Sequence, residues 1–445
     1  MLNLIIPYDF NYEKANLRDK IQYHLHKKGW KHSELALATG IHKSALSRMM
    51  NGERQFTFDQ INKIEVSLGI ERGELIQHLI EDCYDNNGSV KKGKISALLL
   101  ECTKSERVEV VNKILNQLYN NSSSNAKIIF DSAEKLYNEG FFEQALPLYK
   151  TITQEVKNRL DSKLSVSHFR CFMIMRKLMV NKQRTIGECL DSLTLLLDYI
   201  ERLPNEKLII EAYNEIAVFY NFIEDYKNTL KYADRLIELC RDLKRNCKKG
   251  ILTEQDLDKH YYETLIFKAF ALRCLGRYDE ALEVTAEYAN YNEDYKAMSY
   301  RNTCLIKILQ GSWEHINVYL QTSNDDKKLA SMLSIVFESM LKHEKLNMMR
   351  EFIENNTTLL DVLKGEQGLL WEKYRMKTYQ YLSEYYLKTG QNEQGIDLLL
   401  ESMRTAQSFN NHSRLKQCWF LYTTFAAQVS TEKQNEIQII LRDIL

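Results

Sequence analysis

Apolar residues recur at every third or fourth position along most of the chain, which predicts a protein built almost entirely of α-helices. Leu98, Leu99 and Cys102, followed by Val108 and Val111, have the spacing that places apolar side chains on one face of a helix. Pro interrupts helix interiors, and only three Pro occur in the 445 residues. The pattern therefore predicts an all-α fold with long helices.

Two polar stretches interrupt this pattern and divide the chain into three regions. Residues 85–94, which read Asp-Asn-Asn-Gly-Ser-Val-Lys-Lys-Gly-Lys, have the composition of a linker or an exposed loop. Residues 120–125, which contain only Asn and Ser, form a second interruption. We therefore expect an N-terminal domain over 11–83, a linker with connecting helices over 84–125, and a third region over 126–445.

The third region repeats a short motif that contains a small residue, a turn with Gly or a substitute, an aromatic residue and usually a second small residue. Small residues let two helices approach closely, and Gly readily adopts the left-handed conformation that ends a helix. The motif thus predicts pairs of antiparallel helices. Three copies are clear, with turns at Gly140, Glu224 and Gly276, and two weaker copies have turns at Gly311 and Gly390.

These copies resemble tetratricopeptide repeats, which are helix–turn–helix units of about 34 residues. The turns at Gly276 and Gly311 are 35 positions apart, whereas the other gaps between turns reach 84 and 79 positions. Each long gap is expected to hold a degenerate repeat, one around 168–200 and one around 332–356. The resemblance implies about seven to nine hairpins, stacked into a right-handed α-solenoid with a concave face. An irregular α-helical bundle is the alternative.

The N-terminal region carries a second pattern, in which short helices end at glycines. A helix over about 14–28 is followed by Gly40-Ile41, a Ser-rich helix over 42–50, Asn51-Gly52, and Leu68-Gly69-Ile70. This order resembles the lambda-repressor-like (XRE) helix-turn-helix domain. The resemblance implies that the third helix enters the major groove of DNA. His32 departs from the family pattern, which commonly has Gln there.

Polar residues on the exposed side of the third helix, and others near the expected path of the phosphates, are the candidate DNA contacts. Arg and Lys read guanine in the major groove, and residues near a helix N-terminus contact phosphates. Residues 11–80 contain eleven Lys or Arg and eight Asp or Glu, a net charge of only +3. The candidates are Lys31, His32, Ser33, Lys43, Ser44, Ser47, Arg48, Asn51 and Arg54.

Such mild basicity supplies limited affinity, so we expect a homodimer that reads two half-sites of a double-stranded operator. The C-terminal hairpins are the expected dimer contact, because they carry a run of large apolar residues. These are Trp419, Phe420, Ile437, Ile439, Ile440, Leu441 and Leu445.

The concave face of a repeat array suits an extended or helical peptide, and an Asn side chain can pair with both polar groups of a peptide backbone. Asn214 and Asn221 lie seven positions apart, on one face of a predicted helix. The candidate peptide-binding residues are Arg170, Asn214, Asn221, Phe270, Arg273, Arg301, Gln380 and Glu384. Ordinary solvated polar side chains are the alternative for each of them.

An XRE-like domain joined to a long repeat array resembles the RRNPP regulators of Gram-positive bacteria and their phages. Within that family, the size and the weak repeats are similar to those of the arbitrium receptors and of the bifunctional sporulation-linked regulators. The resemblance implies a transcriptional regulator whose affinity for DNA is controlled by a short signalling peptide. The alternative is a scaffold or adaptor whose repeats sequester a partner protein, with the N-terminal domain only tethering it to DNA.

Composition and motifs favour a cytoplasmic binding protein over an enzyme. The net charge is zero, no basic leader or long apolar stretch occurs, and the nine Cys include no C-x-x-C pair. We expect reduced thiols, with a zinc site or disulfides as the alternative. None of the common nucleotide-binding, zinc-protease or serine-hydrolase motifs occurs. We expect no catalytic residue, no cofactor and no metal, although His24, His26, His32 and His42 suggest a metal site as an alternative.

Overall fold

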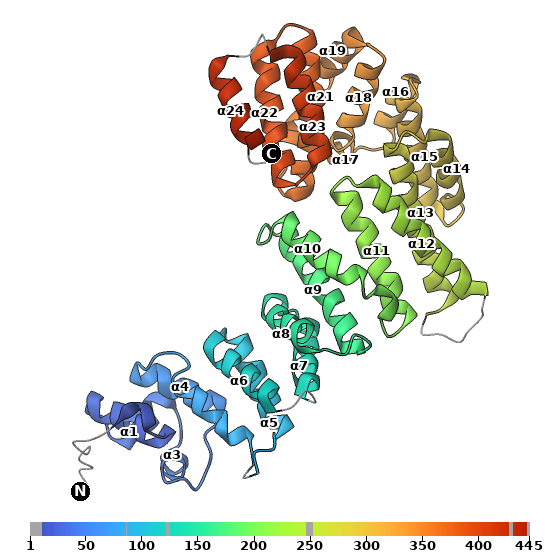
Figure 1. Ribbon diagram of the computed structural model, residues 1–445. Coiled ribbons are helices and arrows are strands. Elements are labelled where there is room, and N and C mark those ends of the chain that lie inside the picture. The colour runs from blue at the N-terminus through green and yellow to red at the C-terminus, as the bar shows by residue number, and fades with distance from the viewer. Residues whose placement is uncertain (1–10, 86, 122–124, 246–251, 427–429, 443–445) are drawn as a thin grey trace. The chain divides into compact units, whose positions relative to one another are not determined.

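The computed structural model describes residues 11–85, 87–121, 125–245, 252–426 and 430–442, and helices dominate it (Figure 1). Within these residues no β-strand forms, and one isolated bridge joins Tyr84 to Val90. The chain divides into two compact units, Met1–Ile174 and Met175–Leu445. No helix in the described ranges is both long enough and apolar enough to cross a bilayer.

The first unit begins with a bundle of short helices that bury one apolar core. Gly29, Gly40 and Gly69 end three of the four α-helices of this bundle in the left-handed conformation, as the sequence pattern predicts. The first α-helix begins at Leu17 because Asn16 caps it by accepting two backbone N–H hydrogen bonds. The elements are η1 (Tyr12–Lys14), α1 (Leu17–Lys28), α2 (His32–Thr39), α3 (Lys43–Met50), α4 (Phe58–Leu68), η2 (Ile76–Leu79) and η3 (Glu81–Cys83).

Two further hairpins and a long helix complete the first unit. The hairpin α5–α6 packs on η2, η3 and α7. The boundary between the two units falls within α9. These elements are α5 (Lys92–Lys104), α6 (Val108–Asn121), α7 (Ala126–Asn138), α8 (Phe142–Glu155) and α9 (Ser162–Val180).

A buried ion pair fixes the hairpin α5–α6 to the N-terminal bundle. Arg107, immediately before α6, donates to the Glu65 carboxylate of α4 at 2.7 Å, and both side chains are almost fully buried. The same carboxylate accepts the backbone N–H groups of Gly73, Leu75 and Ile76. Because its oxygens have several donors, this charge can lie in the core without an unsatisfied group.

The described residues of the second unit form further helical pairs with three additional short helices, one 3-10 helix and two α-helices. Its elements are α10 (Ile186–Leu197), η5 (Ile200–Arg202), α11 (Glu206–Phe222), α12 (Tyr226–Arg245), α13 (Glu254–Cys274), α14 (Tyr278–Tyr288), α15 (Glu293–Leu309), α16 (Glu314–Gln321), α17 (Asp326–Ala330), α18 (Leu333–Lys342), α19 (Leu346–Asn355), α20 (Thr357–Gly365), α21 (Leu369–Lys388), α22 (Asn392–Ser408), α23 (His412–Phe425) and α24 (Thr431–Arg442). The helical-hairpin architecture predicted from the repeated motif is therefore confirmed.

Every predicted turn is a helix end in the left-handed conformation. Gly140, Gly276, Gly311 and Gly390 all have positive φ, and Glu224 adopts the same conformation at φ 66°. At Gly276 the backbone N–H groups after the turn bond back to α13 in the pattern of a Schellman motif. The two long gaps contain the expected hairpins, α9–α10 and α18–α19, and Lys182 and Glu344 occupy their turn positions.

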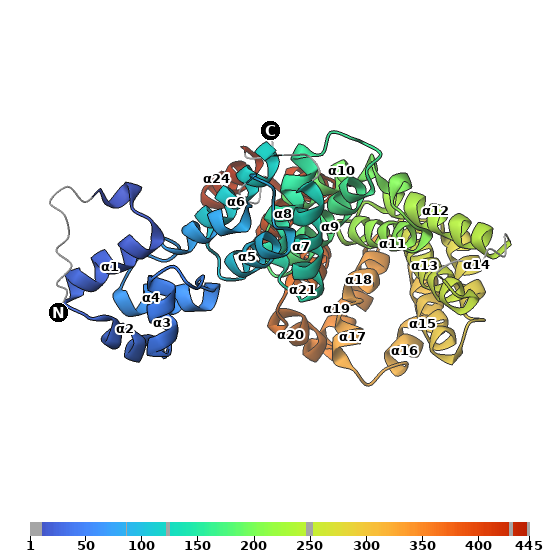
Figure 2. The same ribbon diagram turned by 90° about the horizontal axis from the view of Figure 1, so that it is seen from below.

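The second unit curls until its early and late helices touch (Figures 1 and 2). The ring of Phe222, at the end of α11, lies 5.5 Å from that of Phe409, at the end of α22. Lys373 of α21 donates to the backbone carbonyl of Asn221 at 2.7 Å. The turn between α11 and α12 is therefore enclosed by helices that lie more than 150 positions later in the chain.

The described cysteines are free thiols, and all of them except Cys274 are buried. Burial raises the pKa of Cys83 to about 11 and that of Cys102 to about 12, so these thiols are protonated at neutral pH. Cys247 lies outside the described residues.

Candidate DNA-binding surface and ligand cavity

Helix α3 presents a polar face to solvent, and its opposite face is buried in the bundle. Leu46 and Met49 of α3 are fully buried, and Leu35 and Ala36 of α2 are buried as well. His42 caps α3 by accepting the backbone N–H of Ser44. All nine predicted DNA-contact residues are exposed: Lys31, His32, Ser33, Lys43, Ser44, Ser47, Arg48, Asn51 and Arg54.

Few intramolecular contacts hold these exposed side chains. Arg48 lies 3.7 Å from Glu53, with both side chains more than half exposed, so the pair is weak and its guanidinium can turn to another acceptor. The His32 ring makes a 2.9 Å hydrogen bond with Gln22, and although the residue is exposed, partial desolvation of its ring lowers its pKa. At neutral pH His32 is therefore an uncharged group, unlike the neighbouring lysines.

Arg18 is a member of this surface that the sequence pattern did not indicate. Its Nε donates to the Met49 carbonyl at the end of α3 at 2.8 Å, and its guanidinium lies near Gly52. A cation at a helix C-terminus is favoured by the helix dipole, so Arg18 stabilises α3. Only the packing of α1 against the end of α3 reveals this contact.

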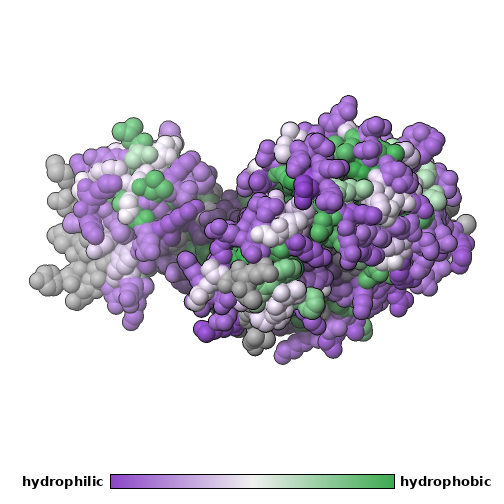
Figure 3. All heavy atoms as spheres, turned by 90° about the horizontal axis from the view of Figure 1, so that it is seen from above, coloured by the Kyte–Doolittle hydropathy of each residue, from purple (hydrophilic) through white to green (hydrophobic). Residues whose placement is uncertain are grey.

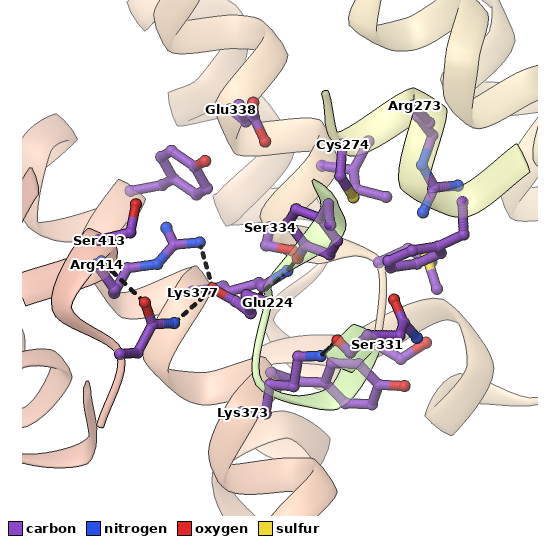
Figure 4. Close-up of a pocket in the computed structure, with 18 of the residues that line it drawn as sticks. Glu224, Arg273, Cys274, Ser331, Ser334, Glu338, Lys373, Lys377, Ser413 and Arg414 are labelled. Carbon is purple, nitrogen blue, oxygen red and sulfur yellow. Dashed lines mark hydrogen bonds and ion pairs between the residues drawn. The ribbon is translucent and has the colours of Figure 1, made fainter. Parts of the chain in front are cut away.

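The second unit contains a cavity of about 340 Å³, lined by residues from α11 to α23 (Figure 4). The cavity lies where the turn between α11 and α12 meets α13, α18, α21 and α23. Six charged side chains line it: Glu224, Arg273, Glu338, Lys373, Lys377 and Arg414. Four of the six are cationic, so the lining has an excess of positive charge.

Glu224 lies among the cationic side chains and neutralises two of them (Figure 4). Its carboxylate is 2.6 Å from the Lys377 amine and 3.1 Å from the Arg414 guanidinium, and it accepts a 2.8 Å hydrogen bond from Asn411. Burial lowers the pKa of Lys377, and the adjacent carboxylate favours the charged amine. Glu224 therefore ties the α11–α12 turn to α21 and α23.

Arg273 and Lys373 are the two remaining cations, and each is 4% exposed. Arg273 lies over the Phe270 ring, 4.6 Å from its centroid, and Lys373 donates to the Asn221 carbonyl. Among the described residues neither has a carboxylate within 4.0 Å. Burial lowers the pKa of Lys373 to about 7.

The predicted peptide-binding residues fall into three groups. Asn221, Phe270 and Arg273 line the cavity. Gln380 accepts a 2.7 Å hydrogen bond from Arg414, and with Glu384 it lines a second, neighbouring hollow. Outside these two hollows lie Arg170, Asn214 and Arg301.

Arg170 is engaged within the first unit. Its guanidinium is 3.1 Å from the Glu134 carboxylate and lies over the Tyr137 ring. These contacts give the Arg170 side chain a structural role. Asn214 and Arg301 are partly buried. A peptide-binding role for these residues stays a prediction.

Sequence reasoning did not identify Lys373, Lys377 or Arg414, because their partners lie far away in the chain. One signal was present. Glu224 stands where the repeat motif calls for Gly, as do Lys182 and Glu344, so this signal marks a residue whose partners should be examined and does not by itself indicate a function.

Hydrophilic side chains cover most of the face shown in Figure 3, with apolar residues in smaller patches. In the C-terminal hairpin the predicted dimer residues divide into two sets. Ile437 and Ile440 are buried, whereas Trp419, Phe420 and Ile439 are exposed at 41%, 74% and 59%. The side chain of Leu441, and Leu445 as a whole, lie outside the described residues.

The N-terminal bundle matches a known family, whereas the comparisons of the whole chain show only loose similarity. The helix-turn-helix family model matches residues 22–75. The sequence matches no curated protein. Similar solved structures are phAimR (15% identity, TM-score 0.39, 95% of this chain and 100% of that chain), a Rap protein complexed with competence and sporulation factor (12%, 0.29, 95% and 99%) and aspartyl phosphate phosphatase F from Bacillus subtilis (13%, 0.33, 92% and 96%).

The class of protein follows from the matched residues and the helices themselves. This is an all-helical protein with an N-terminal helix-turn-helix domain followed by an array of helical hairpins. In the described part of the chain, no three His, Cys, Asp or Glu side chains are grouped so that they could hold a metal ion.

Proposed function

We propose that this protein is a transcriptional regulator of the RRNPP type. Its helix-turn-helix domain binds a double-stranded DNA operator through α3, and a short signalling peptide in the cavity of the second unit changes the affinity for that operator. The protein acts as a homodimer through its C-terminal hairpin. In this division of labour, residues 11–83 contact DNA and residues 126–445 bind the peptide and form the dimer.

One observation carries the proposal most directly. A chain with an exposed polar recognition helix also contains a cavity whose buried polar groups are incompletely satisfied. Arg414 Nε and Asn221 Oδ1 are buried and have no hydrogen-bond partner in the described structure. Unpaired buried polar atoms cost free energy, so a ligand that pairs with them gains affinity.

A pool of synthetic peptides of about five to ten residues tests the proposal. Peptides that bind should raise the melting temperature of the full chain, because a ligand that binds only the folded state stabilises it. The same peptides should change its affinity for a DNA site selected from a random duplex pool.

A matched pair of variants locates the site. Ser331→Trp places a large ring at the cavity wall and should abolish both effects, whereas Ser323→Trp, outside the cavity, should preserve them. Capture of a folded partner protein, with no effect of any peptide, would instead favour the adaptor function.

A further inference from the structure

We infer that the ligand of this cavity presents a carboxylate to Arg273, with Lys373 adding positive charge to the same lining. The inference rests on the proposed function, because it specifies the chemistry of the peptide that the cavity accepts. The carboxylate comes from the C-terminus of the peptide or from an Asp or Glu side chain.

The charge balance of the cavity supports this inference. Glu224 already neutralises Lys377 and Arg414. Glu338 is the other acid of the lining, and among the described residues no Lys or Arg nitrogen lies within 4.0 Å of its carboxylate. These contacts leave the two remaining cations without a carboxylate.

The burial of these cations makes the missing partner costly. A buried guanidinium or ammonium group without a counter-ion loses the solvation that water gives it. Arg273 contacts the face of the Phe270 ring, and Lys373 donates to the Asn221 carbonyl. Both interactions are weaker than an ion pair with a carboxylate. Figure 4 shows Arg273 extending from α13 towards the other lining residues, so its donors face the space that a ligand would enter.

The fork-shaped guanidinium of Arg273 matches the geometry of a carboxylate, with Lys373 as a second point charge. The Ser331, Ser334 and Ser413 hydroxyls line the same cavity and can contact the neighbouring backbone of the peptide. The site therefore favours an acidic ligand over a basic one.

Four pools of random hexapeptides test the inference on the full chain. They combine a C-terminal acid or amide with the presence or absence of Asp and Glu, and mass spectrometry quantifies the peptides retained. We expect at least ~10-fold less retention from the pool without either carboxylate, the loss that a missing charged hydrogen bond produces. Whichever carboxylate source restores retention identifies the group that Arg273 binds.

Variants separate this binding role from a structural one. Arg273→Met should reduce retention of the acidic pools to the level of the uncharged pool, and Arg273→Lys should keep part of it. Because the arginine has no counter-ion, Arg273→Met should also keep or raise the melting temperature of the ligand-free chain. Arg375→Met is the control, since Arg375 bonds the carbonyls of Leu363 and Glu366. It should lower the melting temperature and leave peptide retention unchanged.

The outcomes distinguish failure of the inference from failure of the proposed function. Equal retention of all four pools, or unchanged retention by Arg273→Met, would overturn the carboxylate site and leave the peptide receptor standing. If no pool binds, succinate replaces the peptides, with chloride at equal ionic strength as the reference. Succinate that stabilises wild type and not Arg273→Met would support the anion site and refute the peptide ligand. If succinate also has no effect, both the carboxylate site and the peptide receptor are refuted.

Discussion

Single residues in this protein show how buried charge is either matched or left for a ligand. Glu65 and Arg107 form a matched pair in the first unit, with hydrogen bonds that satisfy the carboxylate. Arg273 and Lys373 in the second unit have no such match. Both arrangements occur in one chain, so burial alone does not decide the role of a charged side chain. Its partners do.

Replacement of Arg107 by Met should loosen the segment that Glu65 holds. Breaking a buried pair by removing one partner costs about 3–5 kcal/mol, because the remaining charge stays buried. Hydrogen exchange measured by mass spectrometry should be faster at the amides of Gly73, Leu75 and Ile76, which bond to Glu65. Arg72→Met, at an exposed neighbouring position, should leave the exchange of these amides unchanged.

Lys373 should make stability depend on pH. Burial lowers its pKa from 10.5 to about 7, so between these values the unfolded chain binds more protons than the folded chain. The free energy of unfolding therefore rises with pH across this window. The charged and titratable groups that act on Lys373 are Cys274, which raises its pKa, and Arg414, which lowers it.

Lys373→Met removes this contribution. Its melting temperature should exceed that of wild type most at pH 7, and the difference should shrink by pH 9. A difference that stays constant between pH 7 and pH 9 would show that Lys373 is not the group responsible.

Arg48 is expected to read bases, and Arg54 to contact phosphates. A good contact to a base contributes about 1–3 kcal/mol of discrimination, so Arg48→Ala should weaken binding to a selected DNA site at least ~10-fold. Random DNA should be bound nearly as before. Arg54→Ala should weaken both kinds of DNA alike. Fluorescence anisotropy measures both affinities, and a selected site that Arg48→Ala binds at full strength would place recognition elsewhere.

At the scale of elements, the turn of each hairpin is the unit that the sequence predicts best. A left-handed helix end favours Gly, so Gly140, Gly276, Gly311 and Gly390 indicated their turns directly. Lys182, Glu344 and Asn410 adopt the same conformation without Gly, and the motif therefore missed those turns. Tertiary packing holds these residues in a conformation that costs about 1–2 kcal/mol.

Parts of the site that lie on one helix could be predicted from the sequence, whereas parts that depend on contacts between distant helices could not. The polar face of α3 follows from spacing within one helix, so the exposure of Lys43, Ser44, Ser47 and Arg48 could be predicted in advance. The cavity depends on contacts such as those of Glu224 with Lys377 and Arg414, across more than 150 positions. Only three of the eight peptide candidates line it, because helix periodicity does not reveal how the second unit curls.

Two substitutions to Gly should have opposite effects. Glu344 is exposed at its turn, and Glu344→Gly relieves the left-handed strain, which should raise the free energy of unfolding by up to about 1 kcal/mol. Glu224→Gly relieves the same strain, but it leaves Lys377 and Arg414 without their carboxylate and should lower that free energy by about 3 kcal/mol. Thermal unfolding of the full chain measures both effects. Equal changes in the free energy of unfolding for the two variants would show that the Glu224 carboxylate does not stabilise the contact of the α11–α12 turn with α21 and α23.

At the scale of the whole molecule, the expected homodimer depends on exposed apolar side chains of the last hairpin. Light scattering after size exclusion should give twice the chain mass of 52.5 kDa for wild type. Phe420→Glu combined with Ile439→Glu should give the monomer mass, because charges at a dimer contact oppose its desolvation. Leu195→Glu, at another exposed apolar position, should remain dimeric. A dimer that survives the double substitution would place the contact on another surface.

The central claim is that one chain couples a ligand cavity to a DNA-binding helix. The most direct test measures the dissociation constant for the selected DNA site with and without a saturating peptide, and that for the peptide with and without DNA. Coupling predicts that both constants change by the same factor, at least ~5-fold, because linkage is reciprocal. Arg273→Met should lose the response. A peptide that binds tightly in the cavity while both constants stay unchanged would contradict the account.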